Sequence, residues 1–215
     1  MITHLDQVLA ETPDPFPPGL TPGGPDHPMR QVTRDVAFEP SSWTSEAAAE
    51  VTARFDELAP DWHTRTDPAR YVSLLDALER GGPIPSGPCL EVGSGTGAAT
   101  GVLAARFARV VSVDLSLEML RRAPDGPAPR VRADGSRLPV PAGVAGAVAL
   151  VNALLFPAEV DRVLSPAGAL YWVNTAGPAT PIYLSAEDVA AAMGPDWSGV
   201  AAVAGRGTWA VLRRA

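Results

Sequence analysis

From Pro88 onward, short β-rich runs alternate with runs of helical spacing. The predicted strands cover residues 89–92, 110–114, 130–134, 144–151 and 169–174, and the predicted helices cover residues 97–108, 117–123 and 157–164. This alternation favours a parallel sheet, because each crossover helix returns the chain to the same end of the sheet. The run 144–151 is almost wholly apolar, as is typical of a strand covered on both faces. The sequence therefore predicts an α/β fold with a Rossmann-like, doubly wound sheet and helices on both faces.

The C-terminal part of the chain adds an antiparallel element to this sheet. Ser185 caps a predicted helix that ends at Met193, and two further β-rich runs follow at residues 200–204 and 208–212. The link between them is Gly205-Arg206-Gly207, and a short link with glycine favours a hairpin. We therefore expect a mostly parallel sheet with an antiparallel C-terminal hairpin strand.

The N-terminal region has a different composition. Residues 12–28 contain seven prolines and three glycines, a density that interrupts helices and strands alike. Residues 1–40 are therefore predicted to form an arm, which either lacks fixed structure or folds over a neighbouring surface or a second subunit. Residues 41–85 carry two helical patterns instead. Thr44 caps the first, and the second begins at Asp67-Pro68.

Composition limits the classes of function. The net charge is −7, and all seventeen basic residues are Arg. An acidic chain is a poor partner for nucleic acid, and the absence of Lys excludes enzymes that need a P-loop, Schiff-base or short-chain-dehydrogenase lysine. Cys89 is the only cysteine, so neither a disulfide nor a multi-thiolate metal site is expected within the chain. Residues 1–16 lack a secretory pattern and no run is long enough to cross a membrane, so we expect a cytoplasmic protein with no membrane partner.

A glycine-rich turn follows the first predicted strand, with the sequence Glu91-Val92-Gly93-Ser94-Gly95-Thr96-Gly97. Such a turn lets the backbone approach a ligand closely and points free amide groups toward it. It therefore predicts a nucleotide-like ligand. With Ala98 the same spacing also fits the dinucleotide fingerprint, so the turn alone leaves an NAD(P)-dependent reductase open.

Three acidic residues narrow the choice of ligand. Glu91 precedes the first glycine, where it would repel a pyrophosphate but attract the ammonium and sulfonium groups of S-adenosylmethionine. Asp114 ends the second strand, where its carboxylate can accept from both ribose hydroxyls, and Asp134 ends the third, where it can accept from the adenine amine. A solvated strand end or a helix cap explains each acid alone. Together with the glycine turn they predict S-adenosylmethionine as the cofactor.

From about Phe55 to the C-terminus, the chain resembles class I S-adenosylmethionine-dependent methyltransferases of the small-molecule, quinone-methylase-like kind. The similar segments are residues 55–62, 90–97, 113–120, 133–139 and 162–170. The resemblance implies a methyltransferase domain over residues 41–215, in which residues 41–85 form lid helices and residues 86–215 the Rossmann-like core. Two departures are Ala145-Gly146 in place of an acidic residue and Ala167 in place of a glycine.

The resemblance also implies the contacts to the cofactor. Glu91, Gly93 and Gly95 would face the methionine portion, and Asn152 would lie nearest the reacting methyl group. The predicted cofactor-binding set is Phe55, Trp62, Arg65, Glu91, Gly93, Ser94, Gly95, Asp114, Leu115, Asp134, Gly135 and Asn152. Leu115 would pack on an adenine face, and Asp134 and Gly135 would lie at the adenine edge. Apart from the resemblance, Arg65 can pair with the cofactor carboxylate, with simple solvation as its alternative.

Two residues are predicted to take part in catalysis. His63 is the candidate general base, although an exposed loop histidine without a chemical role is the alternative. Asn152 would orient the acceptor, with capping of the following helix as its alternative. The sequence thus predicts methyl transfer by a bacterial enzyme, a monomer or a homodimer, to a small-molecule acceptor whose reacting atom, O, N or C, stays open. A cofactor-binding protein without catalytic activity and an NAD(P)-dependent reductase remain as alternatives.

Overall fold

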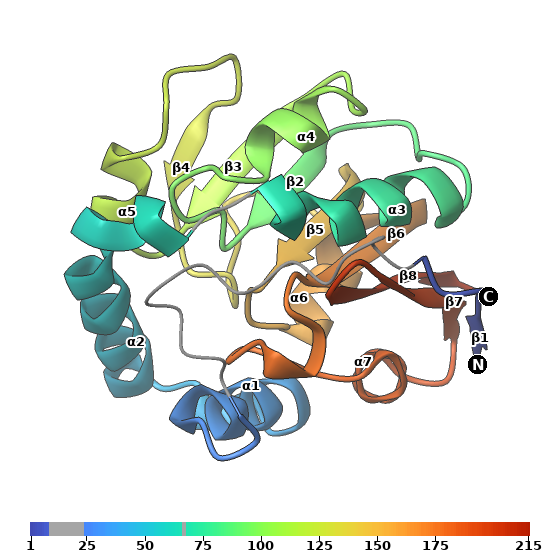
Figure 1. Ribbon diagram of the computed structural model, residues 1–215, viewed down its shortest axis with the longest axis horizontal. Coiled ribbons are helices and arrows are strands. Elements are labelled where there is room, and N and C mark those ends of the chain that lie inside the picture. The colour runs from blue at the N-terminus through green and yellow to red at the C-terminus, as the bar shows by residue number, and fades with distance from the viewer. Residues whose placement is uncertain (9–23, 66–67) are drawn as a thin grey trace.

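The computed structural model describes residues 1–8, 24–65 and 68–215 (Figure 1). Its strands form one eight-stranded sheet in the order β1-β7-β8-β6-β5-β2-β3-β4. The strands are β1 (Ile2–His4), β2 (Cys89–Val92), β3 (Val110–Asp114), β4 (Arg130–Arg132), β5 (Ala145–Val151), β6 (Leu164–Asn174), β7 (Trp197–Ala204) and β8 (Gly207–Arg214). Only β8 runs antiparallel to its neighbours, β6 and β7. The predicted mostly parallel sheet with an antiparallel hairpin strand is confirmed.

Side chains of the central strands alternate between two apolar layers. In β6, Leu170 and Trp172 pack on one face, whereas Tyr171 and Val173 pack on the other. Successive side chains point to opposite faces, and both faces are covered. Nearly every residue of these strands is therefore buried, which is why the strands are apolar throughout. The core therefore lies on both sides of the sheet.

Helices cover both faces, as predicted. The helices of the α type are α1 (Pro28–Phe38), α2 (Ser45–Leu58), α3 (Val72–Arg80), α4 (Thr100–Ala104), α5 (Leu117–Arg121), α6 (Pro157–Val163) and α7 (Ala186–Met193). The short 3-10 helices are η1 (Pro40–Ser42), η2 (Ala59–Arg65), η3 (Pro68–Tyr71) and η4 (Gly177–Ala179). Figure 1 shows α3 and α4 on one side of the sheet and α1 and α7 on the other. None of the helices within the described ranges has the length and apolar character needed to cross a membrane.

Several element boundaries differ from those predicted. The helix expected over residues 97–108 is reduced to α4, because Gly97 has a positive φ of 75° and the turn continues beyond it. The strand expected to end at Asp134 stops at Arg132, so Asp134 lies in the loop. By contrast, β6 begins at Leu164, because that residue pairs with Ala145 of β5.

The predicted arm contains structure that the sequence analysis missed. β1 pairs in parallel with β7 at the edge of the sheet. α1 begins with His27 as N-cap and Pro28 in its first turn, and it buries Met29 and Val36. Proline suits the first turn of a helix, so the proline-rich composition concealed this helix start. The predicted cap Asp67 lies outside the described residues.

Candidate functional site

A cavity of about 1160 Å³ opens where β2, β3, β5 and β6 end. Ligands of doubly wound sheets bind in this crevice, because the strand ends and the loops after them converge there. Ten members of the predicted cofactor-binding set line the cavity: Phe55, Trp62, Glu91, Gly93, Ser94, Gly95, Asp114, Leu115, Gly135 and Asn152. Asp134 does not line it, and the side chain of Arg65 lies outside the described residues. The glycine turn, the lid segment and three strand ends therefore share one space.

The glycine turn closes on the end of β3. Gly93 and Gly95 have positive φ angles of 73° and 54°, which favour glycine. A Cβ atom on Gly93 would lie 2.5 Å from the Cβ of Ala153, so this position lacks space for any side chain. The amides of Gly93 and Ser94 donate to the carbonyl of Val113, at 2.8 Å and 3.0 Å. The prediction that these amides are free to bind a ligand is therefore wrong, because the turn folds back onto its neighbouring strand.

Glu91 is the buried acid of the site, with 2% of its surface exposed. Its Oε2 accepts hydrogen bonds from the hydroxyls of Thr100, at 2.5 Å, and Ser112, at 3.1 Å. Burial raises the pKa of this carboxyl to about 7, with a smaller contribution from the charge of Asp114, although the two hydroxyl bonds oppose the shift. Near neutral pH, a cation in the cavity would therefore draw Glu91 into its ionised form.

Asp114 holds the glycine turn and still faces the cavity. Its Oδ2 accepts from the amide of Gly95 at 2.7 Å, and its Oδ1 accepts from the amide of Ser116 at 2.8 Å. Burial raises the pKa of Asp114, whereas the backbone hydrogen bonds oppose that rise. Each carboxylate oxygen has a second lone pair, so two further donors can bind. This geometry suits a pair of ribose hydroxyls.

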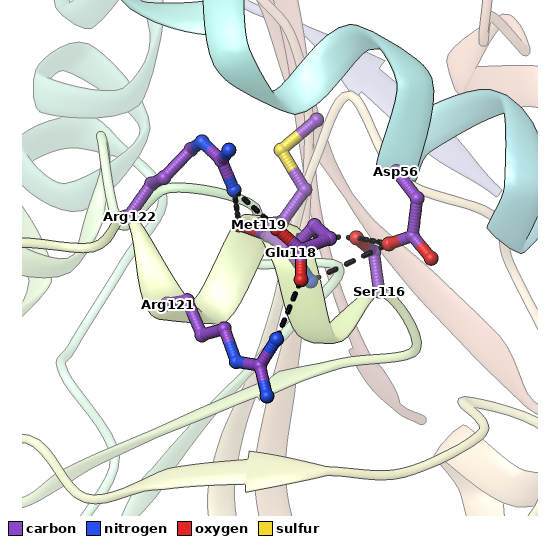
Figure 2. Close-up of polar contacts among 6 residues, drawn as sticks. All are labelled: Asp56, Ser116, Glu118, Met119, Arg121 and Arg122. Atoms are coloured by element: carbon purple, nitrogen blue, oxygen red, sulfur yellow. Dashed lines mark hydrogen bonds and ion pairs between the residues drawn. The ribbon is translucent and has the colours of Figure 1, made fainter.

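A second carboxylate, that of Asp56, attaches α2 to the start of α5 (Figure 2). Asp56 of α2 accepts from the hydroxyl of Ser116 and from the amide of Glu118, the latter at 3.4 Å. The same hydroxyl caps α5 by accepting from the amide of Met119 at 3.0 Å. The sequence analysis missed this contact, because no local pattern pairs residues that are sixty positions apart.

Asp134 bonds to another side chain of the protein. Both of its oxygens accept from Nε1 of Trp43, at 3.1 Å and 3.0 Å, and Oδ1 also accepts from the amide of Ser136 at 2.8 Å. Trp43 lines the cavity, as does Phe156, whose ring centre lies 5.2 Å from that of Trp43. The indole therefore stands on the cavity side of the carboxylate, and the sequence analysis identified neither aromatic residue as part of the site.

The sequence comparison agrees with this geometry. Residues 90–172, which contain the glycine turn, Asp114 and Asn152, match a family model described as a methyltransferase domain. Residues 90–172 are therefore similar to the methyltransferase domains of that family. A comparison with curated proteins gave no match.

Solved structures with the fold of this methyltransferase domain include the DhpI-SAH complex, which shares 20% identity over 80% of this chain and 98% of that one, with a TM-score of 0.63. A candidate S-adenosylmethionine-dependent methyltransferase from Methanococcus maripaludis shares 17% identity over 76% of this chain and 91% of that one, with a TM-score of 0.53. In the complex of the Haloferax volcanii Trm112 methyltransferase activator, the matched chain shares 24% identity, with a TM-score of 0.49. That match covers 55% of this chain and only 59% of the other. At these identities the DhpI-SAH complex and the Methanococcus maripaludis protein show the fold alone.

The residues of the methyltransferase domain suit S-adenosylmethionine. Oγ of Ser94 is buried beside the cavity and has no hydrogen-bond partner among the described residues. A buried hydroxyl without a partner carries a desolvation cost that a polar ligand atom would remove. Glu91 suits an ammonium group, and Asp114 suits hydroxyl donors. Within the described ranges, no group of three or more His, Cys, Asp or Glu side chains is placed to hold a metal ion.

Asn152 is fixed at the end of β5 in an unusual conformation. Its φ of 53° is the only positive value among the described non-glycine residues. Its Nδ2 donates to Oγ1 of Thr175 at 2.8 Å, and its Oδ1 accepts from the amide of Thr175 at 2.9 Å. The alternative role as a helix cap is wrong, because α6 begins at Pro157 with Phe156 as N-cap. Asn152 is thus a rigid part of the cavity wall.

The two aromatic residues of the lid segment lie in the site, whereas the histidine does not line it. The rings of Phe55 and Trp62 meet edge to face with centres 5.9 Å apart, and both line the cavity. Nε1 of Trp62 is 3.9 Å from the place a Cβ of Gly95 would occupy, so this ring covers the glycine turn. His63 is exposed, and its role as a base stays a prediction.

The other end of the methyltransferase cavity is built from segments that the sequence analysis did not connect. Tyr71 comes from η3, Thr180 follows η4, and Arg206 lies in the turn between β7 and β8. Thr180 is buried, and its hydroxyl accepts from the amide of Ala176 at 3.2 Å. In the sheet order this polar wall lies on the side of β6 and β8, away from Asp114 at the end of β3.

Proposed function

We propose that the methyltransferase domain binds S-adenosylmethionine in this cavity and transfers the methyl group to a small-molecule acceptor. The observation that carries the proposal is the continuity of the cavity, which joins the glycine turn and Asp114 to the wall of Tyr71, Thr180 and Arg206. Pockets for one drug-sized ligand measure about 300 to 1,000 Å³. A cavity of about 1160 Å³ therefore has room for a cofactor and a small second molecule.

The cofactor would lie along the ends of β2, β3 and β5. Glu91 and the hydroxyl of Ser94 support binding of the methionine portion, because Glu91 can carry a negative charge and the hydroxyl has no partner among the residues that the structure describes. Asp114 supports binding of the ribose through its remaining lone pairs. Leu115 and Gly135, which line the same cavity, support placement of the adenine. When bound, S-adenosylmethionine supplies a methyl group on an electron-poor sulfonium.

The protein would then contribute position and exclusion of water. Holding a nucleophile in line with the methyl carbon lowers the barrier by about 7 to 11 kcal/mol in well-oriented systems. Asn152, held on both polar atoms by Thr175, provides a rigid wall for this alignment. Phe55 and Trp62 line the same cavity, and Trp62 lies over the glycine turn. A phenol or an enol acceptor would need a base, whereas a neutral amine or a thiolate would need none.

The first experiment is a calorimetric titration of the protein with S-adenosylhomocysteine and, separately, with NAD. We expect binding of S-adenosylhomocysteine and none of NAD; binding of NAD alone would refute the proposed cofactor. Asp114→Asn should weaken S-adenosylhomocysteine by about 1.5 to 3 kcal/mol, or roughly 10- to 150-fold, because a charge-assisted ribose contact is lost. Asp125→Asn is the matched control, since the side chain of Asp125 is exposed.

A second experiment tests methyl transfer itself. The protein is incubated with S-adenosylmethionine and a panel of small phenols, enols, amines and thiols, and the S-adenosylhomocysteine formed is counted per molecule of protein. We expect at least one acceptor to give many turnovers. Tight binding of S-adenosylhomocysteine without turnover on any acceptor would favour the alternative of a cofactor-binding protein without catalytic activity.

A further inference from the structure

Trp43 connects the N-terminal segment to the end of the cavity near β4. The residue follows η1, and its Nε1 donates to both carboxylate oxygens of Asp134, at 3.1 Å and 3.0 Å. Its ring lines the cavity, but Asp134 does not. A ligand in the cavity would therefore meet the indole before it met the carboxylate.

Phe156 completes an aromatic corner at this end. Its ring meets that of Trp43 edge to face, with an interplanar angle of 67°. A Cβ on Gly135 would lie 3.1 Å from the ring of Phe156 and 3.1 Å from Val92, so the backbone at Gly135 packs tightly beneath this corner. A flat purine base suits such a corner, because aromatic rings gain from stacked or edge-to-face contacts.

Asp134 is already bonded to groups of the protein. Oδ1 already accepts from Trp43 and from the amide of Ser136, and Oδ2 accepts from Trp43. The indole N–H is a donor only and needs an acceptor when it is buried from water. Oδ2 keeps a second lone pair, so the reason for an indirect role is position: the ring of Trp43 lines the cavity, whereas Asp134 does not.

We propose that Trp43 is a cofactor-contacting residue that packs against the adenine, and that Asp134 is a positioning residue that holds the indole in place. The inference rests on the proposed binding of S-adenosylmethionine. It differs from the role predicted for Asp134, because the carboxylate acts on the base through Trp43. It also gives the N-terminal segment a part in selecting a cofactor with a purine ring.

The test is a double-mutant cycle with Trp43→Phe and Asp134→Ala, titrated with S-adenosylhomocysteine and with adenosine. Each single variant should weaken both ligands about 2- to 10-fold, the range for one lost hydrogen bond. The double variant should bind within about 2-fold of either single variant, because Asp134 acts only through the indole. Trp197→Phe is the control, since this buried tryptophan lies outside the cavity lining.

The outcomes separate this inference from the proposed function. If Asp134→Ala weakens S-adenosylhomocysteine equally with Trp43 present and with Phe at position 43, the carboxylate contacts the base directly and the inference is wrong. If neither variant changes the affinity, Trp43 does not contact the adenine. If the unchanged protein binds no S-adenosylhomocysteine, the proposed function fails first. Melting curves verify that each variant is folded, and Trp43→Phe keeps an aromatic ring against Phe156.

Discussion

Replacement of Glu91 with glutamine should change how stability depends on pH. In the folded protein, burial raises the pKa of Glu91 to about 7, against an ordinary value of 4.5. Between these two values the folded chain keeps the proton and the unfolded chain releases it. The folded state then binds more protons, so the free energy of unfolding falls as pH rises from 4.5 to 7. Below 4.5 the shift has no effect, and above 7 the loss is complete.

The size of the effect follows from the shift. The difference between 7 and 4.5 is 2.5 pKa units, which at about 1.36 kcal/mol per unit corresponds to a loss of about 3 kcal/mol. Glutamine does not titrate. The free energy of unfolding of Glu91→Gln, relative to that of the unchanged protein, should therefore be about this much higher at pH 8 than at pH 4. Urea unfolding followed by tryptophan fluorescence at several pH values measures the difference. Glu79→Gln on the exposed side of α3 is the control.

A difference in free energy of unfolding that stays constant from pH 4.5 to pH 7 would refute the reasoning, because Glu91 would then not titrate in that window.

The same residue makes a prediction about binding. An ammonium group near Glu91 favours its ionised form, so the affinity for S-adenosylhomocysteine should rise as pH passes through 7. In Glu91→Gln this rise should be absent.

Three further variants test other parts of the site. Gly93→Ala should weaken S-adenosylhomocysteine more than about 10-fold, because its Cβ would meet Ala153 at 2.5 Å, whereas Gly101→Ala has open space and should bind normally. Asp56→Ala should lower the free energy that holds α2 against α5 by about 1.5 to 3 kcal/mol, so hydrogen exchange of α2 should become faster. Unchanged exchange would mean that the contact carries no stability. His63→Ala should leave S-adenosylhomocysteine binding intact, since His63 does not line the cavity; equal turnover at every pH would exclude a role as base.

Much of the core was predictable because local patterns define it. An almost wholly apolar run predicted β5, a short β-rich run predicted most of β6, and two such runs joined by a glycine link predicted the terminal hairpin of β7 and β8. Local chemistry also predicted that Glu91, just before the glycine turn, and Asp114, at the end of the next strand, belong to one site. Both line the cavity. These residues lie at strand ends, and the end of a parallel strand is a fixed position in this kind of sheet.

Local sequence patterns were less informative where backbone groups or side chains bond to, or pack against, another part of the fold. The turn amides were predicted to be free, but Gly93 and Ser94 donate to Val113. The helix α1 was missed, because His27 and Pro28 lie in a proline-rich stretch whose composition suggests an arm. In both cases the local structure depends on contacts with a segment elsewhere in the fold, which local sequence patterns do not identify.

By itself, the sequence determined the succession of strands and helices from residue 89 onward and the glycine turn with its two acids, because spacing along the chain sets these features. The tertiary structure alone decided which side chains meet across the cavity. Trp43 meets Asp134 over a separation of 91 residues, and Asn152 meets Thr175 over 23. Such pairs depend on where whole helices and loops pack. The energy of that packing is spread over many contacts, and no short stretch of sequence carries it.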